Sequence, residues 1–181
     1  MIHILKGPVH SGKTTLLKKT ILLLRKNHLR VDGYLSESTW KNKKFIGYDL
    51  LDLKDDRSHP FIRKRGREEW QRIGPFYFLP ETLDIAKKII HRCKEADLCV
   101  VDEVGPLELE GQGVWPALKD VLMTPGQNTL LVARESILHN LREKIQTDNV
   151  VMYDIGLHEK PARLAESLFL EVEKQRKQRQ I

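Results

Sequence analysis

A glycine-rich segment close to the first residue of this 181-residue chain has the residue types and spacing of a phosphate-binding loop. It fits the pattern G-x-x-x-x-G-K-[ST], and its residues are Gly7, Pro8, Val9, His10, Ser11, Gly12, Lys13 and Thr14. The glycines allow successive backbone N–H groups to turn toward one concavity, where an anion binds. We expect Lys13 to reach the β- and γ-phosphates of a nucleotide as a catalytic cation. The Thr14 hydroxyl is expected to hold Mg²⁺, and the Thr15 hydroxyl to contact the α-phosphate.

The segments on both sides of this loop supply the context that the pattern requires. Residues 2–5 form a short apolar run that predicts a strand, and after the loop Leu16, Leu17, Ile21 and Leu24 recur at helical spacing. The predicted order is therefore strand, glycine loop, helix. The N-terminal end of that helix would add its partial positive charge to the site.

Two acidic residues follow a second apolar run. Residues 98–101 are all apolar, which is typical of a central parallel strand buried on both faces, and Asp102 and Glu103 end that run. Asp102 is predicted to approach the loop from a neighbouring strand and to join Thr14 as a Mg²⁺ ligand. Glu103 is a candidate catalytic residue that orients or deprotonates the attacking water, and its alternative is an exposed loop acid.

An arginine follows a third apolar run, residues 129–133. Ligands bind at the carboxyl ends of parallel strands, so Arg134 is a candidate catalytic residue that stabilises charge on the γ-phosphate. The alternative for Arg134 is a surface salt bridge. Further candidates for the same role are Arg63, Arg65 and Arg67.

Strand and helix patterns alternate along the chain and predict an α/β fold. The expected sheet is mostly parallel with helices on both faces, in a single domain over residues 1–181. Residues 31–36 and 44–53 are expected to pair as a small β-ribbon. Residues 57–74 are polar and basic, with Pro60 and Gly66, and predict a mobile segment without packed elements. The basic tail, residues 174–181, is expected to fray.

Charge and composition limit the remaining possibilities. The formal net charge of +6 and pI near 9.3 favour polyanionic partners. Basic runs are usually solvated, however, and they lack the interleaved aromatic residues that stack single-stranded bases, although Trp40 and Trp70 lie near them. Nucleic-acid binding is thus possible but unsupported. No signal-peptide pattern and no apolar run long enough for a bilayer are present, so we expect a cytoplasmic protein with no membrane contact, in which Cys99 is a small buried residue.

Three stretches together resemble the THEP1-type nucleoside-triphosphatases, a P-loop family. The first is the phosphate loop and the second is residues 102–109, an acidic-Gly-Pro-x-Glu-Leu pattern. The third is the pair of segments 33–37 and 47–50, and the resemblance extends to about residue 155. It implies a RecA-like fold that hydrolyses ATP, GTP and other nucleoside triphosphates with little base selectivity. By the same resemblance, residues 98–105 form a second nucleotide-binding segment, which adds Val101, Val104 and Gly105 to Asp102 and Glu103. Glu108 matches the acid after the proline turn, without an assigned role.

The chain departs from this family in its basic residues. Family members carry arginines shortly after the position of Glu37, whereas this chain has Trp40, Lys41, Lys43 and Lys44. A lysine binds phosphate but cannot reproduce the bidentate fork of arginine. Residues 57–72 also form a longer and more basic insertion than the family pattern.

Three hypotheses therefore remain after the sequence alone. The first is a Mg²⁺-dependent nucleoside-triphosphatase. The second is a P-loop kinase that transfers the γ-phosphoryl group to a nucleoside or other small acceptor, with residues 57–74 as a closing lid. The third is a nucleotide-gated binding protein whose basic surface engages RNA or a protein. Base preference, oligomeric state and protein partners are not determined by any pattern in the sequence.

Overall fold

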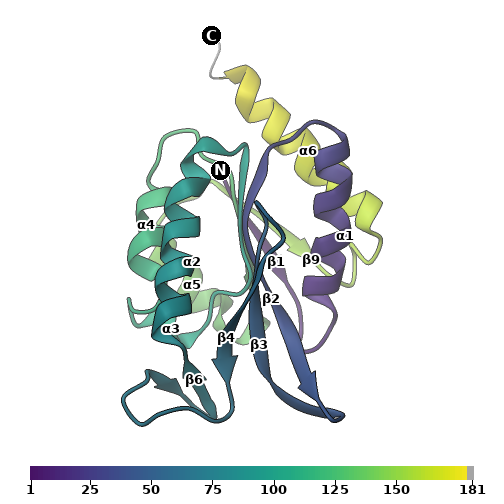
Figure 1. Cartoon of the computed structure of the whole chain (residues 1–181). Coiled ribbons are helices and arrows are strands. Elements are labelled where there is room, and N and C mark those ends of the chain that lie inside the picture. The colour runs from purple at the N-terminus through teal and green to yellow at the C-terminus, as the bar shows by residue number, and fades with distance from the viewer. Residues whose placement is uncertain (179–181) are drawn as a thin grey trace.

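Nine strands form one sheet, in the order β5-β6-β4-β3-β2-β7-β8-β1-β9, in the computed structural model, which describes residues 1–178 (Figure 1). The strands are β1 (Ile2–Lys6), β2 (Val31–Lys41), β3 (Lys44–Asp52), β4 (Ser58–Arg63), β5 (Arg72–Ile73), β6 (Phe76–Phe78), β7 (Leu98–Val101), β8 (Thr129–Ala133) and β9 (Val150–Asp154). The helices are α1 (Lys13–Lys26), α2 (Pro80–Arg92), α3 (Pro106–Leu109), α4 (Trp115–Leu122), α5 (Leu138–Ile145) and α6 (Pro161–Gln178), with 3₁₀ turns at Cys93–Glu95 and Glu135–Ile137.

The parallel half of the sheet positions the predicted site. Strands β2, β7, β8, β1 and β9 pair in parallel, with Lys6 opposite Ala133 and Val101 opposite Leu131. The carboxyl ends of β1, β7 and β8 therefore lie at one edge of the sheet. The phosphate loop, Asp102 and Arg134 follow these three ends directly. Strand β8 lies between β1 and β7, so Asp102 approaches the loop from the next strand but one rather than from an adjacent strand.

Helices cover both faces of the sheet, as the alternation predicted. Figure 1 shows α1 and α6 on one face and α2, α4 and α5 on the other. Each face has its own apolar core, and the side chains of β7 alternate between them: Leu98 and Val100 join the core under α1 and α6, while Cys99 and Val101 join the other. This alternation confirms a central strand that is buried on both faces.

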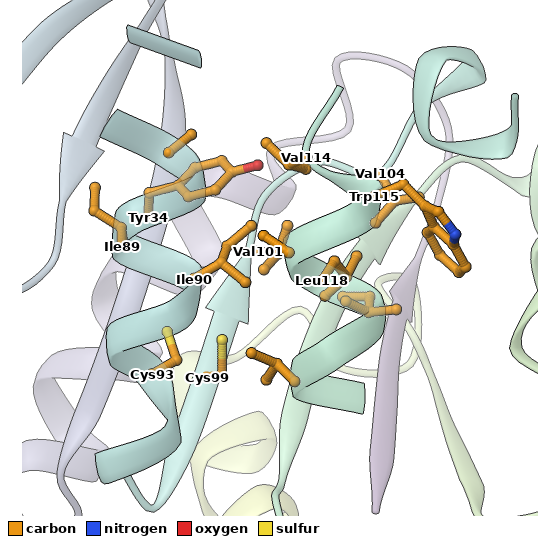
Figure 2. Close-up of a cluster of buried hydrophobic side chains, with 14 of the residues drawn as sticks. Tyr34, Ile89, Ile90, Cys93, Cys99, Val101, Val104, Val114, Trp115 and Leu118 are labelled. Atoms are coloured by element: carbon orange, nitrogen blue, oxygen red, sulfur yellow. The ribbon is translucent and has the colours of Figure 1, made fainter. Parts of the chain in front are cut away.

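The core under α2 and α4 contains both cysteines. Figure 2 shows Cys93 and Cys99 next to each other, with Ile90 and Leu118 close by in the same cluster. Both thiols are free and fully buried, and burial raises the pKa of Cys99 well above its usual value. The prediction that Cys99 is a small buried residue is confirmed.

The antiparallel half of the sheet is larger than the ribbon that the sequence predicted. Strand β2 continues to Lys41, turns at Asn42 and Lys43, which have positive φ angles, and returns as β3. Strands β4, β6 and β5 then extend the sheet by further antiparallel pairs.

The interpretation of residues 57–74 as a segment without packed elements is wrong for its first part. Ser58–Arg63 forms β4, which pairs with β3, and Phe61 in this strand is buried. The Phe61 ring packs edge-on against Tyr34 and Phe78, 6.0 and 5.7 Å away between centroids. These partners are distant in sequence, so a local reading of proline and charge did not reveal them.

The prediction that the chain frays from residue 174 is also wrong for the residues that the structure describes. Helix α6 continues to Gln178, and within its last turns Arg176 forms an ion pair with Asp97, 2.5 Å away. Burial alone would raise the pKa of Asp97, but its hydrogen bonds with Arg30 and Arg176 lower that pKa to about 2. The rest of the predicted tail, residues 179–181, lies outside the described residues. Within the described part of the chain, no helix has both the length and the apolar character needed to cross a bilayer.

Candidate active site

The phosphate loop connects β1 to α1 and encloses a pocket of about 200 Å³ at the carboxyl edge of the sheet. Gly12 has φ +85°, which favours glycine, and its carbonyl accepts the first hydrogen bond of α1 from the Leu16 N–H. Gly7 has no room for a side chain, because a Cβ there would lie 2.4 Å from Ile155. The pocket is lined by Val9, His10, Ser11, Gly12, Lys13, Thr14, Thr15, Ser36, Ser38, Tyr48, Glu103 and Arg134.

Lys13 is buried in the loop and binds the loop itself. Its Nζ donates hydrogen bonds to the carbonyl oxygens of Gly7 and Pro8, at 3.0 and 2.6 Å. Burial lowers the pKa of Lys13. The ammonium group is therefore held at the pocket by neutral acceptors, and anionic phosphate oxygens would be stronger acceptors at the same place.

Thr14 and Asp102 meet at the edge of this pocket. The Thr14 hydroxyl donates a 2.7 Å hydrogen bond to Oδ2 of Asp102, across 88 positions of sequence. The Ser36 N–H donates to the same oxygen at 3.4 Å, and the Ser36 hydroxyl donates to the Asp102 carbonyl at 2.5 Å. Asp102 is only 2% exposed, and this burial raises the pKa of its carboxyl group to about 7.

Glu103 and Arg134 form an ion pair across the same edge. Arg134 Nε donates to Glu103 Oε1 at 2.7 Å, with the Glu103 side chain 25% and the Arg134 side chain 40% exposed. Both residues line the phosphate pocket, so the structure brings together the two candidates that sequence reasoning placed on different strands. The peptide bond between Asp102 and Glu103 is cis.

A second cavity, of about 180 Å³, continues from the phosphate pocket. The two share Thr14, Ser36, Tyr48, Glu103 and Arg134. The far wall is apolar and comes from α3 and the antiparallel strands, with Phe61, Ile73, Phe78 and Leu107. Glu103 therefore lies where the phosphate pocket and this second cavity meet.

Glu108 shapes the loop that follows the two acids. Its Oε2 accepts a hydrogen bond from the Gly105 N–H at 2.9 Å, and its Oε1 accepts one from the Val114 N–H at 3.3 Å. The side chain is buried, and burial raises its pKa. Glu108 thus ties both ends of the segment containing α3 together, which explains an acid at this position without a catalytic role.

The structure separates the remaining arginine candidates from the site. Arg63 forms an ion pair with Asp49 and donates to the Tyr48 carbonyl, and it does not line the phosphate pocket. Arg65 and Arg67 are exposed and lie outside that pocket as well. Of the arginines considered, Arg134 alone lines it among the described residues.

Sequence reasoning missed Ser36 and Tyr48 as pocket residues. Ser36 follows the part of β2 that pairs with β7, so the strand-end rule that identified Asp102 also applies to it. Tyr48 reaches the pocket through the antiparallel pairing of Ser38 with Tyr48. No local signal in the sequence indicates that register.

Comparison with known proteins agrees with this geometry. A family model described as NTPase matches residues 3–168. The chain belongs to the THEP1-type nucleoside-triphosphatase family. It is 28% identical to the nucleoside-triphosphatase THEP1 of Thermofilum pendens, over 91% of this chain and 93% of that protein. It is 32% identical to THEP1 of Hyperthermus butylicus, over 70% of this chain and 67% of that protein.

Solved structures of this family have the same fold. The crystal structure of THEP1 from Aquifex aeolicus superposes with a TM-score of 0.74 at 21% identity, covering 96% of this chain and 99% of that one. The solution structure of a human cancer-related nucleoside triphosphatase gives a TM-score of 0.70 at 24% identity, covering 91% and 94%. The RecA-like, P-loop fold class inferred from the sequence is confirmed.

Membership of the THEP1-type family establishes the class of reaction. The chain is an enzyme that binds nucleoside triphosphates and hydrolyses them. This result favours the first of the three sequence hypotheses over the phosphotransferase, since the curated relatives are named as triphosphatases.

Proposed function

We propose that this triphosphatase requires Mg²⁺ and hydrolyses ATP, GTP and other nucleoside triphosphates to the diphosphate and phosphate with little base selectivity. The observation that carries the proposal is the contact between Thr14 and Asp102 beside the phosphate pocket, 2.7 Å between oxygens. It joins the glycine loop to the second acidic segment in the arrangement that P-loop enzymes use for a metal nucleotide.

The donor atoms at this contact suit Mg²⁺. The cation prefers oxygen ligands at about 2.0–2.1 Å in an octahedron, which separates adjacent ligands by about 3 Å. The Thr14 and Asp102 oxygens have a similar separation. Burial of Asp102 favours its neutral form and raises its pKa to about 7. A cation bound beside the carboxyl group would favour the ionised form instead.

The residues of the chain then have distinct roles. Lys13 exchanges the carbonyls of Gly7 and Pro8 for phosphate oxygens, and the loop N–H groups bind the same anion. When bound, Mg²⁺ supplies positive charge against the oxygens of the transferred group. Glu103 accepts a proton from the attacking water while the oxygen of that water forms a bond to the γ-phosphorus. The bond between the γ-phosphorus and the oxygen that links it to the β-phosphate breaks, and the diphosphate leaves. Arg134 holds Glu103 in place and can offer its remaining N–H groups to the γ-phosphate.

Low base selectivity is proposed from the nature of these contacts. The loop amides, Lys13, Thr14 and Asp102 all address the triphosphate and the metal, which every nucleoside triphosphate shares. Binding energy at a shared group cannot discriminate between substrates. Of the remaining residues of the second segment, Val101 and Val104 are fully buried and support this segment from the core, while Gly105 lines the second cavity.

Phosphate release from ATP, GTP, CTP and UTP tests the proposal, each measured with MgCl₂ and with EDTA. We expect the kcat/KM values of the four nucleotides to lie within about tenfold of each other. We also expect the activity to disappear when Mg²⁺ is removed, because a metal stabilises the transition state by several kcal/mol, and about 1.4 kcal/mol corresponds to a tenfold change in rate. A preference above about 100-fold for one base would contradict low selectivity. Full activity in EDTA would contradict the metal requirement.

A further inference from the structure

The outer end of the β2–β3 ribbon carries an uncompensated cluster of positive charge. We define the basic tip as Lys41, Lys43, Lys44, Lys64 and Arg65, together with Trp40. All six are exposed, and none of the five cations forms an ion pair with the described residues. Strand β4 brings Lys64 to this end, where its N–H donates to the Ile46 carbonyl at 2.9 Å. Four of these cations, Lys41, Lys44, Lys64 and Arg65, line one surface groove together with Phe45 and Ile46.

Aromatic rings lie among these cations in space, although the basic runs of the sequence lack them. Trp40 is 63% exposed and its ring lies 5.5 Å from that of Phe45. The Lys64 ammonium lies over the ring of Phe45 as well, 4.9 Å from its centroid. In the same antiparallel extension, Arg67 lies over Trp70 at 5.8 Å. The tertiary fold therefore places aromatic rings among basic residues, an arrangement that the basic runs of the sequence lack and whose absence argued against nucleic-acid binding.

The basic tip extends from the same edge of the sheet as the nucleotide site. Strand β2 pairs with β7 only as far as Tyr34, and the rest of β2 continues beyond that edge (Figure 1). Ser36 touches Asp102, and Lys41 is five residues further along the strand, or about 17 Å at ~3.3 Å per residue. Tyr48, which lines the phosphate pocket, has its ring 5.1 Å from Phe45. The rings of Tyr48 and Phe45 thus connect the pocket to the exposed ring of Trp40.

We propose that the basic tip binds single-stranded nucleic acid, with backbone phosphates on its lysines and arginine and an unpaired base on the face of Trp40. Cations without internal acid partners attract a polyanion, and contact with phosphates releases counterions from it. An exposed indole offers a surface on which any base can stack. A duplex keeps its bases paired and cannot use that ring, so a single strand is the favoured ligand.

Fluorescence anisotropy with fluorescein-labelled 12-nucleotide oligo(U) and oligo(dT) tests this proposal on the full chain. We expect saturable binding at about 10 µM or tighter in 100 mM KCl. Three to five phosphate contacts predict a slope of log K against log salt of about −2 to −3.5. Trp40→Ala should weaken binding about tenfold and abolish most of the quenching of tryptophan fluorescence. Tight binding of either oligonucleotide supports the proposal, and the one that binds more tightly shows whether RNA or DNA is the preferred ligand.

A matched pair of charge-reversal variants distinguishes binding at the basic tip from a general effect of net charge on binding. Lys43→Glu/Lys44→Glu should weaken binding more than tenfold. Lys88→Glu/Lys94→Glu makes the same change in net charge on exposed residues at α2 and the turn after it, and should weaken binding less than threefold. Phosphate release without oligonucleotide serves as the folding control and should be unchanged in all variants. The proposal is overturned by equal effects of the two reversals, by no saturable binding up to about 100 µM protein, or by a duplex that binds as tightly as the single strands.

Discussion

The hydroxyl of Thr14 and the carboxylate of Asp102 lie 2.7 Å apart, although 88 positions of sequence and one intervening strand separate them. Two parallel strands that end at one edge of the sheet bring about this contact. The Ser36 backbone N–H donates to the same carboxylate oxygen and fixes its orientation. The catalytic account depends on this relationship.

Replacing Asp102 should weaken the dependence of the enzyme on its metal. Asp102→Asn keeps the size of the side chain but removes the charge, so we expect a fall in kcat/KM on the order of 100-fold and a higher Mg²⁺ concentration for half-maximal activity. Phosphate release as a function of MgCl₂ at fixed ATP measures both. Thr14→Ser retains the hydroxyl and should stay within a few fold, while Thr14→Val should behave like Asp102→Asn. An unchanged Mg²⁺ dependence in Asp102→Asn would remove this residue from the metal site.

Arg134 should matter for turnover far more than for stability. Its ion pair with Glu103 has a 40% exposed arginine side chain, and such pairs contribute about 0–1 kcal/mol to folding. Loss of a positive charge at the γ-phosphate costs more, so Arg134→Gln should lower kcat by at least about 100-fold. Arg134→Lys should recover only part of this loss, because it cannot pair with Glu103 and a phosphate in the same way. Equal small losses of stability and of kcat in Arg134→Gln would indicate a surface salt bridge only.

Glu108 should prove to be a structural residue. Glu108→Ala leaves the buried N–H groups of Gly105 and Val114 without their acceptor, and we expect the free energy of unfolding to fall by about 1–3 kcal/mol. Urea titration followed by circular dichroism measures this change. Glu110→Ala, an exposed acid two residues later, is the matched control and should stay within about 0.5 kcal/mol of the wild type. Equal stability of the two variants would contradict the role of Glu108 in tying the two ends of this segment together.

The buried His3 should make stability depend on pH. Its Nδ1 lies 3.2 Å from the Tyr153 hydroxyl, and burial lowers its pKa from 6.5 to about 4. The folded state therefore binds fewer protons than the unfolded state between these values. The contribution of His3 is fully present above pH 6.5 and is lost as the pH falls toward 4, by roughly 3 kcal/mol in total.

The difference between wild type and His3→Gln isolates this effect. Asp102 and Glu108 have raised pKa values and contribute with the opposite sign in the same range, but they do so in both proteins. We expect the wild type to lose stability relative to His3→Gln on acidification from pH 7 to pH 4.5, in metal-free and nucleotide-free buffer. A difference that does not change with pH would show that His3 does not titrate in this way. Asp97, with its pKa near 2, acts only below this range.

The sequence was most informative where chemistry and local structure coincide. The phosphate loop needs a glycine turn before a helix, and Asp102 and Arg134 each end an apolar run, so a local pattern and the strand-end rule suffice to find them. The ion pair of Arg134 with Glu103 could not be predicted in the same way. It depends on the order of β7 and β8 in the sheet, which no local pattern encodes.

Errors arose where long-range packing overrides local composition. Strand β4 contains Pro60 and lies among basic residues, yet Phe61 finds Tyr34 and Phe78 as partners. The polar neighbours of Arg176 predict a frayed tail, but Arg176 forms an ion pair with Asp97, which is distant in sequence. The aromatic contacts of the basic tip are likewise not visible in the sequence, because Trp40 and Lys64 both reach Phe45 only through the pairing of β2, β3 and β4.

The most direct test of the catalytic account is a comparison of Glu103→Gln with the wild type in two assays, phosphate release and nucleotide binding by calorimetry. Glutamine keeps the shape of the side chain but cannot accept the proton of the attacking water. We predict a fall in kcat of about 100-fold or more, with affinity for the magnesium nucleotide within about threefold of the wild type. Undiminished turnover in a variant that still binds nucleotide would contradict the role of Glu103 and the account built on it.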